Sequence, residues 1–132
     1  MSDLKNIALT VEAAQSAEEI QEWIGTSRGR SGSAPDKMDR IRLGFAYAIV
    51  HDVSLSREGI GRRGGSNYDV GGLDPDGLMA ETVRIYYRDK DQSVLEEPYR
   101  AVEVLMNKGL LLLSEHRAQG GFTSMGDLLS AE

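Results

Sequence analysis

Cysteine is absent from the 132-residue chain, which excludes disulfide bonds, thiolate metal sites and cysteine nucleophiles. Histidine occurs only twice, as His51 and His116, so we do not expect an all-histidine metal site. No apolar run, including those at residues 43–50 and 109–113, is long enough to span a bilayer, and no basic segment with a following apolar run opens the chain. The sequence therefore predicts a cytoplasmic protein without membrane contact, metal or cofactor.

Two motifs of catalytic sites are also missing. The sequence has no G-K-[ST] step of a phosphate-binding loop and no H-E-x-x-H. The adjacent carboxylates Glu96 and Glu97 fall at a predicted helix junction, where solvated charge is a more common role than acid–base chemistry. We therefore expect no catalytic residue and no enzyme activity. A small nuclease is an alternative only if Glu81, Asp89 and Asp91, which lie on different helical turns, converge on Mg²⁺.

Acidic residues outnumber basic ones, but the two signs are unevenly spread. The net charge is −6, yet residues 28–63 carry eight Lys or Arg against four Asp or Glu, and the flanking segments are acidic. An acidic protein as a whole does not attract polyanions. Because charge effects fade over roughly 10 Å at moderate salt, the basic segment can still contact phosphates locally. The same segment can instead meet an acidic surface of a partner or of a sister subunit.

The basic segment runs into a glycine-rich stretch that contains G-x-G-x-x-G at Gly59, Gly61 and Gly64. A dinucleotide site needs this motif between a strand and a helix. Here a predicted helix precedes the motif and a glycine-rich loop follows it, so we reject the dinucleotide interpretation. Glycine amides beside Arg62 and Arg63 suit phosphate contact, and a solvated connection is the simpler alternative.

Helical periodicity appears in four segments, at about residues 11–24, 35–53, 75–90 and 98–118. The second segment is apolar nearly all round, as in a central helix, and its Gly44 predicts a closely approaching neighbour. In the third segment, Asp74 is the predicted N-cap. The predicted buried stripe of that helix is Met79, Val83 and Tyr86.

These signals predict one domain over residues 1–132 with an all-α fold. We expect a compact bundle of four main helices plus a short C-terminal helix that starts at Ser124. A long Gly-rich loop joins the second and third helices. Regular structure is not expected in this loop, although a short hairpin around "GGSNYDVGG" is weakly indicated.

Three segments carry a resemblance to a known family. They are "NIALTVEAAQSAEEIQEWIG", "DRIRLGFAYAIVHDVSLS" and "MAETVRIYYRDKDQSVLEEPYRAVEVLMNKGLLLLSEHRAQGGFTSMGDLL", the last with a polar-basic-glycine step at Asn107, Lys108 and Gly109. Their order and pattern resemble the DndE-type small accessory protein of bacterial DNA phosphorothioation, the systems that replace a non-bridging oxygen of the DNA backbone with sulfur. The resemblance implies a helical homotetramer without cofactor or catalytic centre. It also implies a role in bacterial defence, binding of nicked or duplex DNA, and other proteins of the sulfur-modification system as partners.

Two functions follow from the basic segment and the resemblance. In the first, the protein is a non-catalytic accessory subunit that contacts DNA phosphates, with predicted DNA-binding residues Arg28, Arg30, Lys37, Arg57, Arg62 and Arg63. In the second, it is an oligomeric protein–protein scaffold without direct DNA binding. The basic segment of one chain would then meet the acidic half of a neighbour.

Overall fold

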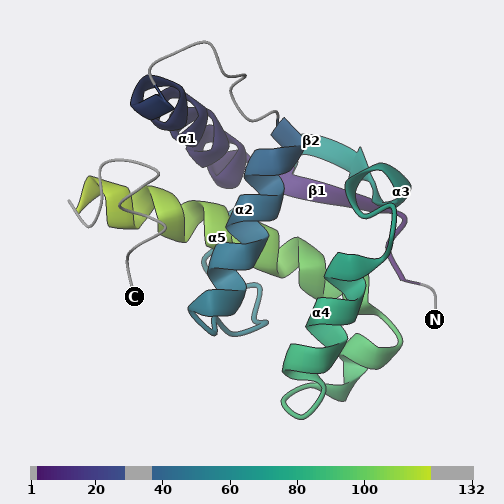
Figure 1. Cartoon of the computed structure of the whole chain (residues 1–132). Coiled ribbons are helices and arrows are strands. Elements are labelled where there is room, and N and C mark those ends of the chain that lie inside the picture. Colours follow the sequence, from purple (N-terminus) through teal and green to yellow (C-terminus); the bar gives the residue numbers. More distant parts are fainter. Residues whose placement is uncertain (1–2, 29–36, 120–132) are drawn as a thin grey trace.

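The computed structural model describes residues 3–28 and 37–119. In chain order, the elements are β1 (Asn6–Thr10), α1 (Val11–Arg28), α2 (Lys37–Val50), β2 (Arg63–Asp69), α3 (Val70–Leu73), α4 (Leu78–Tyr87), the 3₁₀ helix η1 (Gln92–Leu95) and α5 (Pro98–Ala118) (Figure 1). The four segments with helical periodicity overlap α1, α2, α4 and α5. The short helix predicted from Ser124 lies outside the described residues.

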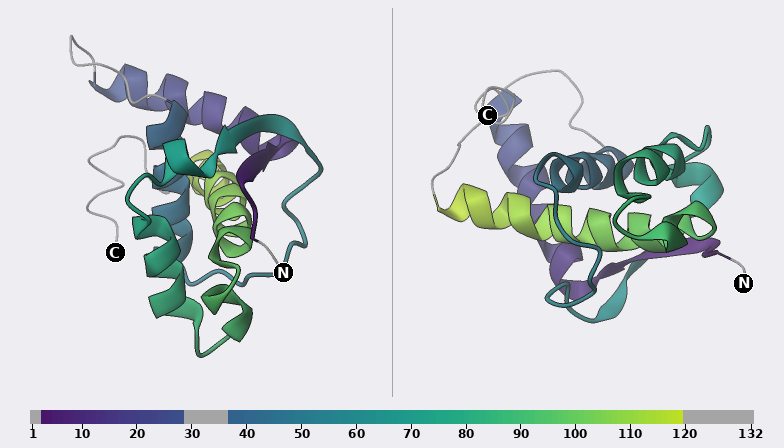
Figure 2. Two further views of the ribbon diagram at one scale, coloured as in Figure 1. Left: turned by 90° about the vertical axis from the view of Figure 1, so that its right-hand side faces the viewer. Right: turned by 90° about the horizontal axis from the view of Figure 1, so that it is seen from below.

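Helix α5 lies in the middle of the fold. Helices α2 and α4 form one layer on one side of α5, and the sheet of β1 and β2 lies on its other side (Figure 2). Helix α1 packs against α5 and β2. The apolar core runs through these layers, and its fully buried members include Leu9, Ile41, Val83 and Leu105. Because neighbours surround α5 on several sides, this helix needs apolar residues on more than one of its faces.

The all-α prediction is wrong, because β1 and β2 form a two-stranded antiparallel sheet. The register pairs Asn6 with Asp69 and Ala8 with Asn67, and it shifts before Thr10. Strand β1 has five residues and continues directly into α1, so its sequence has little room for a strand pattern. Strand β2 contains two glycines, which form strands poorly by themselves. The weakly indicated hairpin around these glycines is instead one strand that satisfies the backbone groups of β1.

The second edge of β1 is covered by two side chains of α5. Glu103 Oε2 accepts a hydrogen bond from the Ala8 amide at 2.8 Å. Asn107 Oδ1 accepts from the Thr10 amide at 2.8 Å, and Asn107 Nδ2 donates to the Ala8 carbonyl at 3.0 Å. Both side chains are buried, with 1% of Glu103 and none of Asn107 exposed. These two residues, one helical turn apart, therefore replace a third strand in the sheet.

Helices α2 and α5 touch through their backbones at Gly44 and Gly109. A Cβ atom built on Gly109 would overlap the carbonyl of Gly44, and one built on Gly44 would lie 2.7 Å from Leu110 Cγ. The sequence-based expectation of a close neighbour at Gly44 is therefore confirmed. The contact brings the two helix axes closer than larger side chains would allow.

Helix α4 begins at Leu78, three residues later than predicted. Asp74 nevertheless binds its first turn, because Oδ1 accepts from the Met79 amide at 2.9 Å and Oδ2 from the Ala80 amide at 3.1 Å. The predicted buried stripe is wrong at one position. Tyr87 is 2% exposed, whereas Tyr86 is 50% exposed. Tyr87 is anchored by its hydroxyl, which donates to the Val53 carbonyl at 2.8 Å.

We expect Gly109→Ala to destabilise the fold by about 3 kcal/mol or more, because the new methyl group overlaps the α2 backbone and cannot be relieved by a side-chain rotation. The matched control is Gly72→Ala, whose Cβ would meet only Met38 Cε at 3.5 Å. That control should change the free energy of unfolding by less than about 1 kcal/mol. Urea denaturation measures both. Equal stabilities of the two variants would contradict the close crossing of α2 and α5.

Candidate functional site

The predicted DNA-binding residues that fall within the described part of the chain lie in different elements. Arg28 ends α1, Lys37 begins α2 and Arg63 begins β2, and Arg30 lies outside the described residues. The structure describes the side chains of Arg57 and Arg62 only, and it does not describe those of Arg28, Lys37 and Arg63. The gathering of all six on one DNA-binding surface therefore stays a prediction.

Arg57 is held by a buried carboxylate. Its Nη1 lies 3.0 Å from Glu103 Oε1, and the Glu103 side chain is only 2% exposed. Glu103 also accepts the Ala8 amide, so one carboxylate joins the loop, strand β1 and helix α5. A buried carboxylate needs such a cationic partner. The sequence analysis did not single out Glu103. The signal that could have found it is an acidic residue between Val102 and Val104 in an apolar helix, because such a charge is buried and needs a partner.

Arg62 occupies a different environment, on the surface where the loop enters β2. Its amide donates to Glu12 Oε1 at 3.2 Å, and its carbonyl accepts from the Val11 amide at 2.9 Å. The preceding Gly61 has φ of 92°, which favours glycine, and a Cβ there would overlap the Glu12 carboxylate. The glycine motif thus begins in the loop and ends inside β2, where it forms the entry into the sheet.

Most other described basic side chains also have partners within the chain. Lys108 Nζ donates to the Ser54 carbonyl at 2.8 Å and to Ser54 Oγ at 2.9 Å, and its burial lowers the pKa of Lys108. Four more pairs join Arg42 with Asp39, Arg84 with Glu81, Lys90 with Asp52 and Arg100 with Glu97. Phosphate groups of DNA would have to compete with these internal partners.

The three carboxylates of the nuclease alternative, all among the described residues, are not grouped around a possible metal ion. Glu81 pairs with Arg84 at 3.2 Å. Asp91 caps η1, because Oδ1 accepts from the Ser93 amide at 3.0 Å and from Ser93 Oγ at 2.7 Å. Asp89 is exposed in the turn after α4. Within residues 3–28 and 37–119, no three His, Asp or Glu side chains are grouped so as to hold a metal ion. The nuclease alternative therefore lacks a metal centre in this part of the chain.

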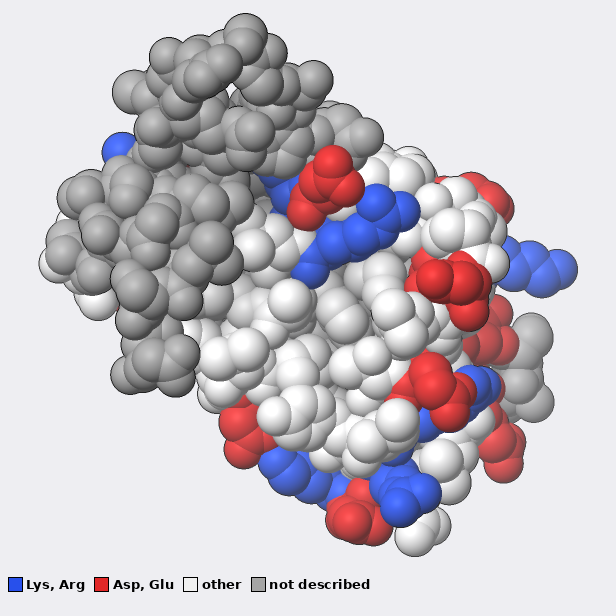
Figure 3. All heavy atoms as spheres, viewed as in Figure 1, with Lys and Arg blue, Asp and Glu red and all other residues white. Residues whose placement is uncertain are grey.

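Helix α4 carries three exposed large apolar side chains, and α2 carries one at its last residue. The exposed fractions are 75% for Val50, 65% for Leu78, 69% for Ile85 and 50% for Tyr86. We call these four residues the α2–α4 face. Uncharged side chains cover much of the area over and between these helices, and charges of both signs lie around it (Figure 3). The sequence analysis missed this face because it assigned apolar helical positions to the core.

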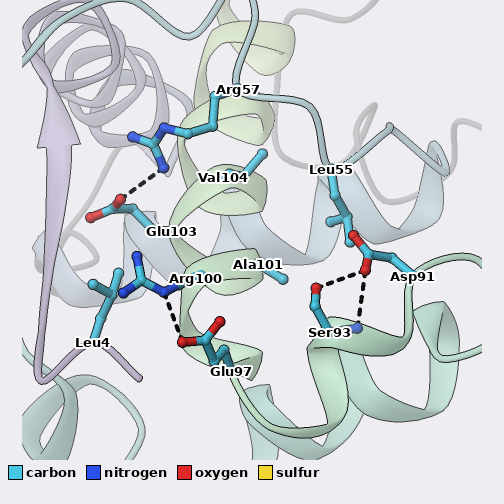
Figure 4. A pocket seen from close by; sticks show the side chains of 10 residues that line it. All are labelled: Leu4, Leu55, Arg57, Asp91, Ser93, Glu97, Arg100, Ala101, Glu103 and Val104. Carbon is cyan, nitrogen blue, oxygen red and sulfur yellow. Dashed lines mark hydrogen bonds and ion pairs between the residues drawn. The ribbon is translucent and has the colours of Figure 1, made fainter. Parts of the chain in front are cut away.

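A cleft of about 400 Å³ lies between the start of α5, η1 and the loop that precedes β2. Arg57 and Glu103 form one ion pair in its wall, and Arg100 and Glu97 form another at 3.3 Å (Figure 4). Asp91 adds a third carboxylate to the lining. Because the two arginines face three carboxylates, the cleft has no positive excess that would attract a phosphate.

Comparison of the chain with protein-family models, with curated proteins and with solved structures gives no match. The resemblance to DndE-type proteins therefore stays a prediction from the pattern of segments. Among the described helices, none has the length and apolar character needed to cross a membrane.

Arg57 and Arg62 should differ in stability experiments. We expect Arg57→Ala to lower the free energy of unfolding by about 1–3 kcal/mol, because it leaves the buried Glu103 carboxylate without its cation. Arg62→Ala should change stability by less than about 0.5 kcal/mol, as is usual for exposed side chains. Thermal and urea denaturation measure these differences.

The Glu103→Gln substitution in the Arg57→Ala background tests whether the unpaired Glu103 charge causes the loss of stability. It removes the unpaired charge while keeping an acceptor for the Ala8 amide, so it should recover part of the lost stability. A double variant that is less stable than Arg57→Ala alone would contradict the proposed role of the ion pair.

Proposed function

We propose that this chain is a non-catalytic accessory subunit that associates with a second copy of itself through the α2–α4 face. The exposure of Val50, Leu78, Ile85 and Tyr86 on one layer of the fold carries the proposal. Exposed apolar patches rimmed by polar residues are typical of protein interfaces, whereas single exposed apolar side chains are ordinary. Tyr86 adds an aromatic side chain of the type that often dominates interface energy.

The charges beside the face favour a second copy as the occupant. Arg42 pairs with Asp39 at 3.2 Å on α2, and Arg84 pairs with Glu81 at 3.2 Å on α4. In a two-fold symmetric dimer the same patch meets itself. If the residues around the face all carried charge of one sign, the two copies would repel each other. Ion pairs of both signs can face one another without excess charge.

The cellular role in this proposal comes from the sequence resemblance. The assembled subunit serves a bacterial DNA phosphorothioation system and holds its other proteins together. The scaffold form is favoured over direct DNA binding because Arg57, Lys108 and several exposed arginines already have partners within the chain.

Self-association is tested by light scattering after size-exclusion chromatography. We expect the wild-type chain to form an oligomer, and Ile85→Asp to weaken its association by at least about 30-fold, or about 2 kcal/mol, because a carboxylate would be buried in the interface. The matched control is Asn67→Asp, which adds the same charge to an exposed position of β2 on the sheet side. A monomeric wild-type chain, or equal association of both variants, would contradict the proposal.

Direct DNA contact is the second candidate, and the exposure of Arg62 at the entry to β2 favours it. Fluorescence anisotropy with intact and nicked duplex DNA over a salt series is the measurement. If Arg62 and Arg63 each contact a phosphate, the double variant Arg62→Ala/Arg63→Ala should reduce the slope of log K against log salt by about 2. Arg88→Ala, an exposed arginine after α4, is the control. An unchanged slope removes this loop from the DNA-binding surface.

A further inference from the structure

The only two histidines of the sequence come together in the fold. His51 directly follows the last residue of α2, and His116 lies in the last turn of α5. Their ring centroids are 5.3 Å apart, with an angle of 74° between the ring planes. Neither histidine has a second histidine four residues away in the sequence, so this pair could not be found from local spacing. The packing of α2 on α5 creates it.

Tyr47 fixes the orientation of one member of the pair. Its Oη lies 2.5 Å from His116 Nδ1, and its ring centroid lies 4.3 Å from that of His51. The phenol oxygen of Tyr47 can accept the Nδ1 proton of His116, which leaves the lone pair of Nε2 to bind a metal ion. Such a hydrogen bond to the second ring nitrogen is the usual support of a metal-binding histidine.

The separation of the two rings is compatible with one shared ion. Metal–nitrogen bonds of about 2.0–2.1 Å at a tetrahedral angle place two imidazole centroids about 5 Å apart, close to the observed separation. We propose that His51 and His116 together chelate one divalent ion of the zinc, nickel or copper class, which imidazole ligands favour. Solvent completes the coordination, because the described residues contain no third His, Asp or Glu grouped with this pair.

The ion would link the end of α2 to the end of α5 through its two histidine ligands. A ligand that binds only the folded chain raises its stability according to its concentration and affinity. The effect should therefore appear as a rise in the melting temperature, independent of any function of the protein. A ring pair that only packs edge to face would show no such response to metal.

Calorimetric titration and thermal denaturation of tag-free protein with Zn²⁺, Ni²⁺ and Cu²⁺ test the proposal. We expect one ion per chain and a higher melting temperature, with no rise in Mg²⁺, which prefers oxygen ligands. His51→Ala and His116→Ala should each abolish the rise. Tyr47→Phe should keep both ligands but weaken binding by about 10-fold or more.

Spectroscopy separates the pair from binding elsewhere on the chain. With Cu²⁺ bound, electron paramagnetic resonance should show coupling to two nitrogen nuclei in the wild-type chain and to fewer in either histidine variant. Two results would overturn the proposal: a melting temperature that does not respond to any of the three ions, or a response that survives in both histidine variants.

Discussion

The hydrogen bonds from Glu103 and Asn107 to strand β1 are the interactions on which the arrangement of the fold depends. A two-stranded sheet has two open edges, and an unpaired edge is costly to bury. Here the side chains of α5 supply donors and acceptors to one edge of β1 while β2 supplies the other. Helix α5 can therefore lie directly against the sheet. The opposite side of α5 is then left for α2 and α4, which fixes the order of the layers.

The same interactions explain how far the sequence could predict the fold. The main helices follow from periodicity within each segment, which is local information. Strand β1 depends on Asn107, which lies far away in the sequence on α5. Strand β2 contains two glycines, and its pairing with β1 stabilises it. Both strands are therefore decided by contacts between distant segments, and no window of sequence contains them. The wrong choice of Tyr86 instead of Tyr87 as the buried residue of α4 is a smaller error than the missed strands. The two tyrosines are adjacent and lie at the edge of the apolar stripe.

The functional interpretation depends on a similar division between local and distant information. A cluster of arginines in the sequence is a local feature, and it suggested a surface for polyanions. In the fold, Arg57 neutralises a carboxylate that is needed at the strand edge, so its charge has a structural use. The exposed apolar residues of α2 and α4, and the meeting of His51 with His116, appear only when the helices are packed. The features most informative about binding thus arise from the packing of helices rather than from any motif.

The polar-basic-glycine step of α5 shows what a shared pattern can mean. Asn107 binds β1, Lys108 binds the loop at Ser54, and Gly109 admits the backbone of Gly44. Three consecutive residues thus point to three different neighbours and join the sheet, the loop and α2 to one helical turn. Another chain that forms the same three contacts would need similar residues at these positions, whatever it binds. A likeness between two chains at these three positions alone would reflect similar packing, and it would not show that the two proteins bind the same partners.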